Sequence, residues 1–579
     1  MDWRSLLLAL MALPVTWTVW SIYSFYQNYN LAKQTGLPIL FAPIDRFNLF
    51  WLVAPKPLAF VLRNLPFGLG SFVRYGHMGW QYVDKYRIHE EVGGAFVIVT
   101  PAAIEVQIAD ALAVYDISLR KNAFPKPRRM YIPLEIFGPN LDTTNGGDWQ
   151  RHKRVTAPPF NEKNNKVVWN EALRHASQLV QIWTGRGEDG FVSTINDLSR
   201  LTLQVISFFA FGRRNDLKTD QELEDSSGHS QDIFPETLHY LLRHVVALML
   251  LPKNILKFSY ILPSTVRKTA ETIRDYQIMT NEMIQQERNE LSEKDSNADN
   301  LLTAMVRTEV TQTVQDGSGL DGKRTVSWGL TDEEIKGNVF IFGFAGHDTT
   351  ANTLSYCIFL LAANPEWQDW IAEETTRLVK AFGPVETWDY EKVFPQLKRT
   401  LAALFETLRL YGPVSFIPKT TVEARTISIE GKDYWIPPDT ELTVNCTAIH
   451  SLPRYWGSDS LVWRPSRFID STESKATGDP SLERFLTPEK GRFVAWSDGG
   501  RICPGKKFAQ VEFVAVISKL LSGHRVSGVP SPGEEVEATQ ARIRREVEDS
   551  LLYVTLQMRN PHTIPLRWEK VGSESVRSI

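Results

Sequence analysis

The sequence predicts a mainly α-helical protein with one large domain. Three long segments, residues 198–211, 331–363 and 505–521, carry apolar residues at helical spacing. The interior of the 579-residue chain has no linker rich in Pro, Gly or Ser and no break in composition. A single domain is therefore favoured over the three or four that length alone suggests. Hydrophobic residues make up 43% of the chain, which is enough for a substantial core.

The N-terminus predicts a membrane-spanning helix ahead of that domain. Residues 5–32 carry no charge, and residues 6–25 are almost wholly apolar. About twenty such residues cross a bilayer as a helix, and Tyr23, Tyr26 and Tyr29 would form an aromatic belt at one interface. A cleaved signal peptide is the alternative, but it would show a shorter apolar run and a small-residue cleavage site.

The charges that flank the apolar span predict its orientation. Lys33 and Arg46 follow the span, while only Arg4 precedes it. The positive-inside rule then places the body of the protein on the cytosolic side of the membrane.

Composition argues against two classes of protein. The net charge of -3 does not suit a dedicated nucleic-acid binder. The three cysteines, Cys357, Cys446 and Cys503, are too few and odd in number for a disulfide framework. They indicate a reducing compartment, which a reactive thiolate also requires.

The most informative segment is the glycine-rich loop from Trp496 to Gly505. In this loop Cys503 lies two residues after Arg501 and just before the expected helix at 505–521. The positive end of that helix would stabilise a thiolate. A thiolate here suits an axial ligand to haem iron, because it donates electron density and favours O–O cleavage. The alternative is a buried structural cysteine in a surface turn.

The neighbours of Cys503 have roles of their own. Gly499 and Gly505 would allow the backbone to turn tightly and approach a flat macrocycle. Pro504 suits the first position of the following helix. Arg501 can pair with a haem propionate.

A second candidate site lies on the helix expected at 331–363. A capping box at Thr331 to Glu334 predicts its start, and Asn364-Pro365 predicts its end. Within it, residues 342–350 read Phe-Gly-Phe-Ala-Gly-His-Asp-Thr-Thr.

Ala345 and Thr349 are four residues apart and therefore share one face of this helix. The small side chain leaves room for dioxygen, and the hydroxyl can donate a hydrogen bond to it. Thr349 can also bond back to a carbonyl one turn earlier. Asp348 is a proton source connected to solvent. The alternative is a helix with an Ala345-Gly346 packing notch and a polar threonine pair.

A third signature is the pair Glu406 and Arg409, which are three residues apart on one helical face. Such pairs are common on surfaces and contribute little there. Downstream, Arg467 follows Pro465 in the segment Trp463 to Phe468. The three charged residues can form a buried network, which is tolerable only when every member is paired.

Together these motifs resemble the haem-thiolate monooxygenases of the cytochrome P-450 superfamily, in the family's order and over essentially the whole chain after the anchor. The resemblance implies a helical prism with small β-sheets and haem b as cofactor. By position, Cys503 is similar to the axial ligand, Thr349 and Asp348 to the oxygen-activation and proton-delivery pair, and Ala345-Gly346 to the oxygen groove. Glu406, Arg409 and Arg467 resemble the structural network behind the haem.

The resemblance also implies which residues hold the haem propionates and line the pocket. Trp149 matches a propionate-contacting tryptophan. Lys153 and Lys419 stand where the family often has Arg, so they would act as point charges without a bidentate fork. Trp496 stands where Phe is usual, and keeps a ring beside the sulfur. By family position, the substrate would face the loop 124–145 and the residues Phe342, Ala345, Val414 and Phe416.

The anchor and hinge look like those of microsomal members, and the C-terminal half looks like fungal ones. The resemblance therefore implies a membrane anchor (1–32), a hinge and membrane-contact segment (33–60) and a catalytic domain (61–579) facing the cytosol from the endoplasmic reticulum. Its implied partners are O2, membrane lipid and a separate NADPH–cytochrome P-450 reductase, without nucleic acid.

The expected reaction is oxidation, by hydroxylation, of a lipophilic small molecule in secondary metabolism. Two alternatives stay open. One is a haem-thiolate isomerase or dehydratase that needs no external electrons, and the other is a non-catalytic membrane haem protein.

Overall fold

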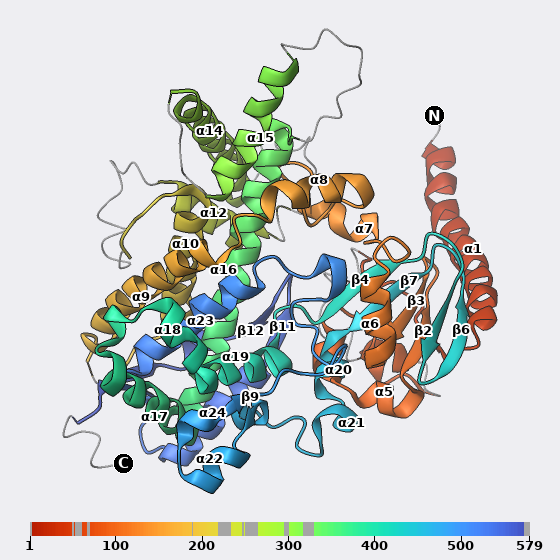
Figure 1. Cartoon of the computed structure of the whole chain (residues 1–579). Coiled ribbons are helices and arrows are strands. Elements are labelled where there is room, and N and C mark those ends of the chain that lie inside the picture. The colour runs from red at the N-terminus through yellow and green to blue at the C-terminus, as the bar shows by residue number, and fades with distance from the viewer. Residues whose placement is uncertain are drawn as a thin grey trace. The chain divides into compact units, whose positions relative to one another are not determined.

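The computed structural model describes residues 3–48, 51, 61–66, 70–187, 189–217, 233–245, 248, 264–293, 300–316 and 329–572. The chain forms two compact units, which are drawn within the whole chain in Figure 1. Unit 1 comprises residues 1–127, 414–462 and 488–503, and unit 2 comprises residues 128–413, 463–487 and 504–579. Because each unit is assembled from three separate stretches, no single linker in the sequence marks the division.

Unit 1 is built on a five-stranded sheet with the strand order β1-β2-β3-β7-β4. Neighbouring strands pair parallel (β1 with β2), antiparallel (β2 with β3), parallel (β3 with β7) and antiparallel (β7 with β4). All residues of β2, β3 and β7 are buried, as expected for Val- and Ile-containing strands that are covered on both faces. The strands are β1 (Ile39–Phe41), β2 (Ala95–Val99), β3 (Ile104–Ile108), β4 (Phe416–Thr420) and β7 (Glu441–Asn445).

Unit 1 also contains a two-stranded hairpin, the long helix α1 and several short helices. The hairpin pairs β5 (Arg425–Ile429) with β6 (Lys432–Ile436). The helices are α1 (Trp3–Thr35), η2 (Ser71–Arg74), α4 (Trp80–Asp84), α5 (Arg87–Val92), α6 (Ala111–Leu119), α20 (Cys446–Ser451), α21 (Pro453–Trp456) and the single turn η9 (Gly499–Arg501).

Helix α1 extends beyond the expected span, and its C-terminal part packs onto the sheet of unit 1 (Figure 1). Ala32 is fully buried there. The rings of Phe25 and Tyr29 lie 5.8 and 5.7 Å from the ring of Phe41 on β1. We expected Tyr29 in an aromatic belt at the membrane interface, but it packs against the protein, because helix α1 continues over the sheet.

The anchor and hinge are described only in part. The side chains of residues 1–11 and 13 lie outside the described part of the chain, as do residues 49–50 and 52–60 of the expected membrane-contact segment. Within what is described, no helix combines the length and apolarity that a bilayer crossing needs. Residues 39–41 of the expected hinge form strand β1 and so belong to the sheet.

The described part of unit 2 is mostly helical and contains three small two-stranded sheets. The longer helices are α8 (Gly146–Thr156), α9 (Glu162–Thr184), α10 (Thr194–Phe211), α12 (Ile233–Arg243), α14 (Ser264–Glu293), α15 (Leu301–Asp316), α16 (Asp332–Ala363), α17 (Pro365–Phe382), α19 (Lys398–Tyr411), α23 (Lys506–Leu521) and α24 (Val536–Glu548). Short helices are α7 (Arg128–Tyr131), η3 (Ile132–Leu134), η5 (Val385–Thr387), α18 (Tyr390–Val393), η6 (Phe394–Gln396), η7 (Pro465–Phe468), α22 (Thr472–Thr477), η8 (Pro480–Leu482) and η10 (Pro561–Thr563). The sheets pair β8 (Ile469–Asp470) with β9 (Arg484–Phe485), β10 (His524–Gly528) with β13 (Leu566–Lys570), and β11 (Ser550–Leu552) with β12 (Leu556–Met558).

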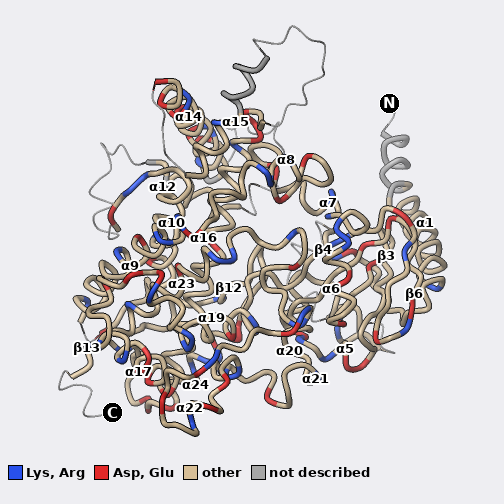
Figure 2. Tube along the Cα trace, in the orientation of Figure 1, with Lys and Arg blue, Asp and Glu red and all other residues tan. Residues whose placement is uncertain are grey.

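Helix α16 is the central helix of unit 2, and its ends follow from local sequence. The predicted capping box is confirmed: the Thr331 hydroxyl accepts from the Glu334 N–H at 3.3 Å, and the Glu334 carboxylate accepts from the Thr331 N–H at 2.9 Å. Asn364 ends the helix, and Pro365 begins α17. Charges cluster in the first turn, and the rest of α16 is mostly tan in Figure 2.

The other two expected helices are present with shifted ends. Helix α10 begins at Thr194, four residues before the expected start at 198, and ends at Phe211 as expected. Helix α23 begins at Lys506 with Gly505 as its N-cap, so Pro504 precedes the helix and does not occupy its first position. Gly505 has φ -78°, a negative value that does not require glycine.

The structure brings the three expected network residues together in unit 2. Arg409 Nε and Nη2 donate to the two Glu406 carboxylate oxygens at 2.7 and 2.8 Å, and both side chains are completely buried. Arg467 Nε lies 3.5 Å from Glu406 Oε1. The Arg464 N–H donates to the same oxygen at 2.8 Å. Glu406 therefore ties α19 to the segment around η7 by hydrogen bonds that satisfy a buried charge.

Replacing Glu406 with Ala should lower the free energy of unfolding by about 3–5 kcal/mol, because it leaves the buried Arg409 guanidinium without its counter-charge. The measurement is the midpoint and slope of urea denaturation followed by tryptophan fluorescence. Glu473→Ala is the matched control, since the side chains of its pair with Arg484 are 49% and 71% exposed, and the pair should contribute about 0–1 kcal/mol. Equal losses in the two variants would contradict the structural role of Glu406.

Candidate active site

The loop that ends at Cys503 is closed by its own backbone in unit 1. The Cys503 N–H donates to the Trp496 carbonyl at 2.9 Å. At Gly499 φ is +63°, and a Cβ there would lie 2.4 Å from the carbonyl oxygen of Ser118 on α6. Both the left-handed backbone and the close approach require glycine at this position. The Asp498 carboxylate accepts from the Gly499 N–H at 2.7 Å and holds the turn.

Aromatic and histidine contacts support the other side of the same loop. The ring of Trp496 lies 5.8 Å from that of Phe493, which stacks on His450 at 5.0 Å. The Val494 N–H donates to His450 Nε2 at 2.9 Å. His450 is thus engaged in holding the loop.

The three cysteines differ in solvent exposure. Cys503 is exposed, whereas Cys357 and Cys446 are buried. Burial raises the pKa of each buried thiol to about 12. A thiolate ligand must lose its proton, so of the three sulfurs that of Cys503 fits the haem iron. The alternative of a buried structural cysteine does not apply at this position, because the side chain is exposed.

The residues expected to hold the haem propionates occur in both units. In unit 2, Lys153 Nζ lies 5.0 Å from the ring centroid of Trp149, and both residues are on α8. In unit 1, Lys419 is buried on β4 and Arg501 is half-buried in η9. These are cationic or N–H donor side chains, which is the chemistry that carboxylates of a haem need. The structure therefore brings Trp149 and Lys153 together, and it gives Lys419 and Arg501 their places in unit 1.

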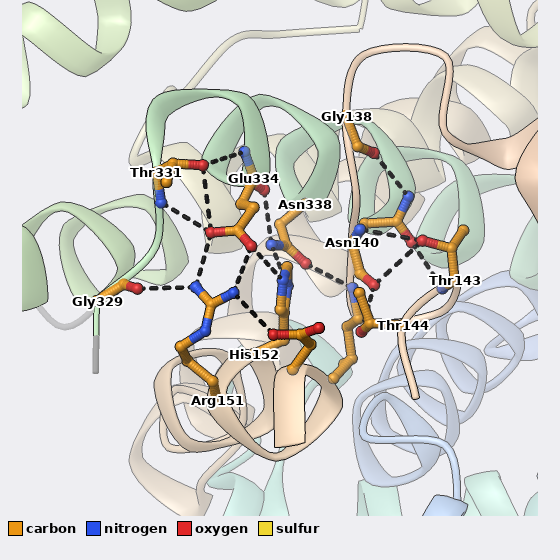
Figure 3. A network of polar contacts seen from close by, with 12 residues as sticks. Gly138, Asn140, Thr143, Thr144, Arg151, His152, Gly329, Thr331, Glu334 and Asn338 are labelled. Atoms are coloured by element: carbon orange, nitrogen blue, oxygen red, sulfur yellow. Dashed lines mark hydrogen bonds and ion pairs between the residues drawn. The ribbon is translucent and has the colours of Figure 1, made fainter. Parts of the chain in front are cut away.

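Helix α8 is fixed to α16 by a polar network that the sequence did not predict (Figure 3). Arg151 on α8 donates to both Glu334 carboxylate oxygens, at 2.7 and 2.5 Å. His152 Nδ1 accepts from Asn338 Nδ2 at 2.9 Å, and Asn338 Oδ1 accepts from the Leu141 N–H at 2.9 Å. The hydrogen bonds of Glu334 with His152, Arg151 and Thr331 outweigh its burial and lower its pKa.

This network joins the loop around residue 141, which was expected near the substrate, to the two helices. The hydrogen bonds connect residues nearly 200 positions apart. The nearest local signal for it was the Asn at position 338, a poor helix former inside a largely apolar helix.

From Gly337 onward, helix α16 is buried except at the expected site. From Gly337 to Ala363 the exposed residue is Ala345, and Gly346, Asp348 and Thr349 are half-buried. The Thr349 hydroxyl donates to the Ala345 carbonyl at 2.7 Å, which confirms the expected bond one turn back along the helix. Ala345 and Thr349 thus share the accessible face of an otherwise enclosed helix.

Gly346 lies against helix α10. A Cβ at this position would lie 2.9 Å from Cδ1 of Ile206 on α10, so the glycine lets the two helices pack closely. The alternative of a packing notch therefore applies to Gly346, while Ala345 remains accessible. The oxygen groove expected at Ala345 and Gly346 stays a prediction.

Asp348 is the single charged residue of α16 between Gly337 and Ala363. Its carboxylate accepts hydrogen bonds from the Thr555 hydroxyl, from Asn352 Nδ2 at 3.2 Å and from Gln557 Nε2 at 3.4 Å. Burial raises the pKa of Asp348, and the hydrogen bonds from Thr555 and Gln557 offset this only in part. The sequence offered no signal for Thr555 and Gln557, which follow more than 200 residues later.

The expected pocket residues differ in their surroundings. Phe342 is buried, with its ring 5.6 Å from that of Phe160. Phe416 lies beneath the guanidinium of Arg46, 4.7 Å from its ring centroid. Val414 is exposed. The structure therefore places Phe342 and Phe416 in packing contacts within their own units, and their expected contact with substrate stays a prediction.

Comparison with known proteins agrees with these observations. A family model described as cytochrome P-450 matches residues 63–544. A cytochrome P-450 monooxygenase of Arthrobotrys oligospora is 28% identical, with 92% of this chain and 93% of that protein covered. One from Penicillium roqueforti is 31% identical, with 86% and 87% covered. A phomenoic acid biosynthesis cluster cytochrome P-450 monooxygenase of Leptosphaeria maculans is 26% identical, with 90% and 91% covered.

The family match covers most of the chain and includes the cysteine loop, helix α16 and the Glu406 network. The protein therefore belongs to the cytochrome P-450 family and is a monooxygenase whose haem is bound through a cysteine thiolate.

Proposed function

We propose that this protein hydroxylates a lipophilic small molecule in a fungal secondary-metabolite pathway, with Cys503 as the haem ligand. The observation that carries the assignment of the ligand is the exposure of Cys503 in a braced loop while the other two thiols are buried. The bound haem supplies the oxygen-activating chemistry, and thiolate ligation favours O–O cleavage. A relative named for phomenoic acid biosynthesis supports the choice of pathway class.

The proposed roles of α16 concern protons. Thr349 holds its hydroxyl on the accessible face beside Ala345, where it donates a hydrogen bond and can redirect it. Asp348 supplies the proton from a site that burial makes more basic than an ordinary aspartate. Electrons come from a separate NADPH–cytochrome P-450 reductase. In this role Thr349 and Asp348 favour monooxygenation over a rearrangement that uses no external protons and electrons.

We also propose that α1 anchors the protein in the endoplasmic reticulum membrane with the catalytic units facing the cytosol. The support is a run of large apolar and aromatic side chains on α1 that are each more than half exposed. These are Val15, Trp17, Val19, Trp20, Ile22, Tyr23 and Tyr26. Exposure of so many such residues on one uncharged segment is costly in water and favourable at a bilayer.

The assignment of the iron ligand is tested by replacing each cysteine with Ala in turn. The Cys503→Ala protein should lose the thiolate-type carbon monoxide spectrum, because no other sulfur is available in thiolate form. Cys357→Ala and Cys446→Ala are the matched controls and should retain that spectrum, since both thiols are buried. A thiolate-type spectrum in Cys503→Ala would refute the assignment.

The role of the Thr349 hydroxyl is tested by Thr349→Ala. The variant should bind haem normally but release peroxide in place of product, with product formation reduced about a hundredfold, as is typical of a lost proton-transfer group. Product and peroxide formed per NADPH are the measurements. Thr353→Ala is the control, because its hydroxyl makes the same bond one turn back, to the Thr349 carbonyl at 2.8 Å, but is buried. If product formed per NADPH fell equally in both variants, the cause would be reduced stability of helix α16.

The anchor is tested by flotation with phospholipid vesicles. Full-length protein should float, and a variant lacking residues 2–24 should remain at the bottom of the gradient. That deletion removes most of the exposed apolar side chains but keeps Phe25, Tyr29 and Ala32, which pack on the sheet. An intact carbon monoxide spectrum shows that the shortened protein is folded. Flotation of both proteins to the same extent would exclude α1 as the main anchor.

A further inference from the structure

The carboxyl group of Asp348 lies against the β11–β12 hairpin of the same unit. Thr555, at the tip of the hairpin, donates its hydroxyl hydrogen to Asp348 Oδ2. Gln557, in β12, reaches Asp348 Oδ1 with its amide at 3.4 Å. Asn352, one turn further along α16, donates to Oδ2 at 3.2 Å. Three neutral side chains therefore surround this carboxyl.

The direction of each hydrogen bond follows from the donors available. The Thr555 hydroxyl also accepts from Asn352 Nδ2 at 3.3 Å and from Gln557 Nε2 at 3.2 Å. A hydroxyl has one hydrogen and two lone pairs. Since both lone pairs face amide N–H groups, the one hydrogen of Thr555 must point to Asp348.

The two oxygens of Asp348 are consequently not equivalent. Oδ2 accepts two hydrogen bonds, from Thr555 and from Asn352 at 3.2 Å. From the described residues, Oδ1 accepts one longer bond, from Gln557. When the carboxyl is protonated, its hydrogen is favoured on the oxygen that accepts less, which is Oδ1.

The charge environment allows this carboxyl to carry a proton. No charged side chain of the described residues forms an ion pair with Asp348, and burial raises its pKa. Neutral donors stabilise a carboxylate less than a guanidinium or ammonium group does. The proton is therefore bound more tightly than in an ion-paired aspartate.

The hairpin is itself held firmly to α16 and its neighbours. The Tyr356 hydroxyl on α16 donates to Ser550 Oγ in β11 at 2.7 Å. The Leu556 N–H of β12 donates to the Pro413 carbonyl at 2.9 Å. Thr555 is buried between these two attachments. Its hydroxyl is thus fixed relative to Asp348 by contacts on both strands.

We propose that Thr555, supported by Asn352 and Gln557, is a positioning residue that fixes the acidic proton of Asp348 on Oδ1. The inference rests on the proposed function, in which Asp348 delivers protons. It adds a segment near the C-terminus to the proton-delivery site and assigns the atom from which the proton leaves.

The test compares Thr555→Val, which keeps the shape and loses the hydroxyl, with Thr555→Ser, which keeps the hydroxyl. The carbonyl stretch of the protonated carboxyl is followed by infrared difference spectroscopy during pH titration of the purified holoenzyme, and the band is assigned by its loss in Asp348→Asn. Thr555→Val removes a hydrogen bond that favours the carboxylate, so the pKa of Asp348 should rise by about one unit. Thr555→Ser should restore the titration of the unaltered protein.

Catalysis provides the second readout. A proton donor stops working as pH rises above its pKa, so the alkaline limb of product formed per NADPH should move to higher pH in Thr555→Val and return in Thr555→Ser. A titration of Thr555→Val identical to that of the unaltered protein would overturn the inference, as would a Thr555→Ser protein that behaves like Thr555→Val. Should Thr555→Val fail to bind haem, Gln557→Met replaces it: loss of this donor should also raise the pKa.

The failure of this inference is distinguishable from failure of the proposed function. If Asp348→Asn leaves product formed per NADPH unchanged, the proposed role of Asp348 is wrong whatever the infrared titration shows. If Asp348→Asn lowers coupling but the Thr555→Val titration is unshifted, the role of Asp348 stands and the positioning role of Thr555 is rejected.

Discussion

Enclosure of α16 is the constraint on which the rest of unit 2 depends. From Gly337 to Ala363 the helix is buried apart from residues 345, 346, 348 and 349, so its accessible part is defined by what surrounds it. Gly346 lets α10 approach closely, and the β11–β12 hairpin covers Asp348. The chemistry available to this helix is then limited to a small side chain, one hydroxyl and one carboxyl. A carboxyl that has neutral hydrogen-bond donors and a pKa raised by burial is a group that can hold a proton.

In unit 1, the cysteine loop is likewise defined by the contacts that surround it. Its sulfur is accessible, and the backbone that leads to it is fixed: the Cys503 N–H bonds to the Trp496 carbonyl, and Gly499 lies directly on α6. Burial keeps the other two thiols protonated at neutral pH. The three side chains are chemically identical, so burial alone distinguishes Cys503 from the other two cysteines as a candidate iron ligand.

Two buried carboxylates of unit 2, those of Glu406 and Glu334, are each paired with an arginine. Glu406 is satisfied by Arg409, Arg467 and the Arg464 N–H. Glu334 is satisfied by Arg151 and by the N-terminal turn of α16. Both networks join helices to loops, so the cost of desolvation is offset while the segments that carry the candidate haem and substrate contacts are fixed in place.

The sequence alone determined the features that depend on neighbours within about one turn of helix. These include the capping box at Thr331, the end of α16 at Asn364, the spacing of Glu406 and Arg409, and the bond from Thr349 to Ala345. Tertiary structure decided the contacts between distant chain segments. Thr555 hydrogen-bonds to Asp348, and Ser118 lies against Gly499. Ile206 packs against Gly346, and Tyr29 packs on the sheet. Local hydrogen bonds and helical spacing are fixed by a few adjacent residues, whereas packing across 200 residues depends on how every intervening element folds.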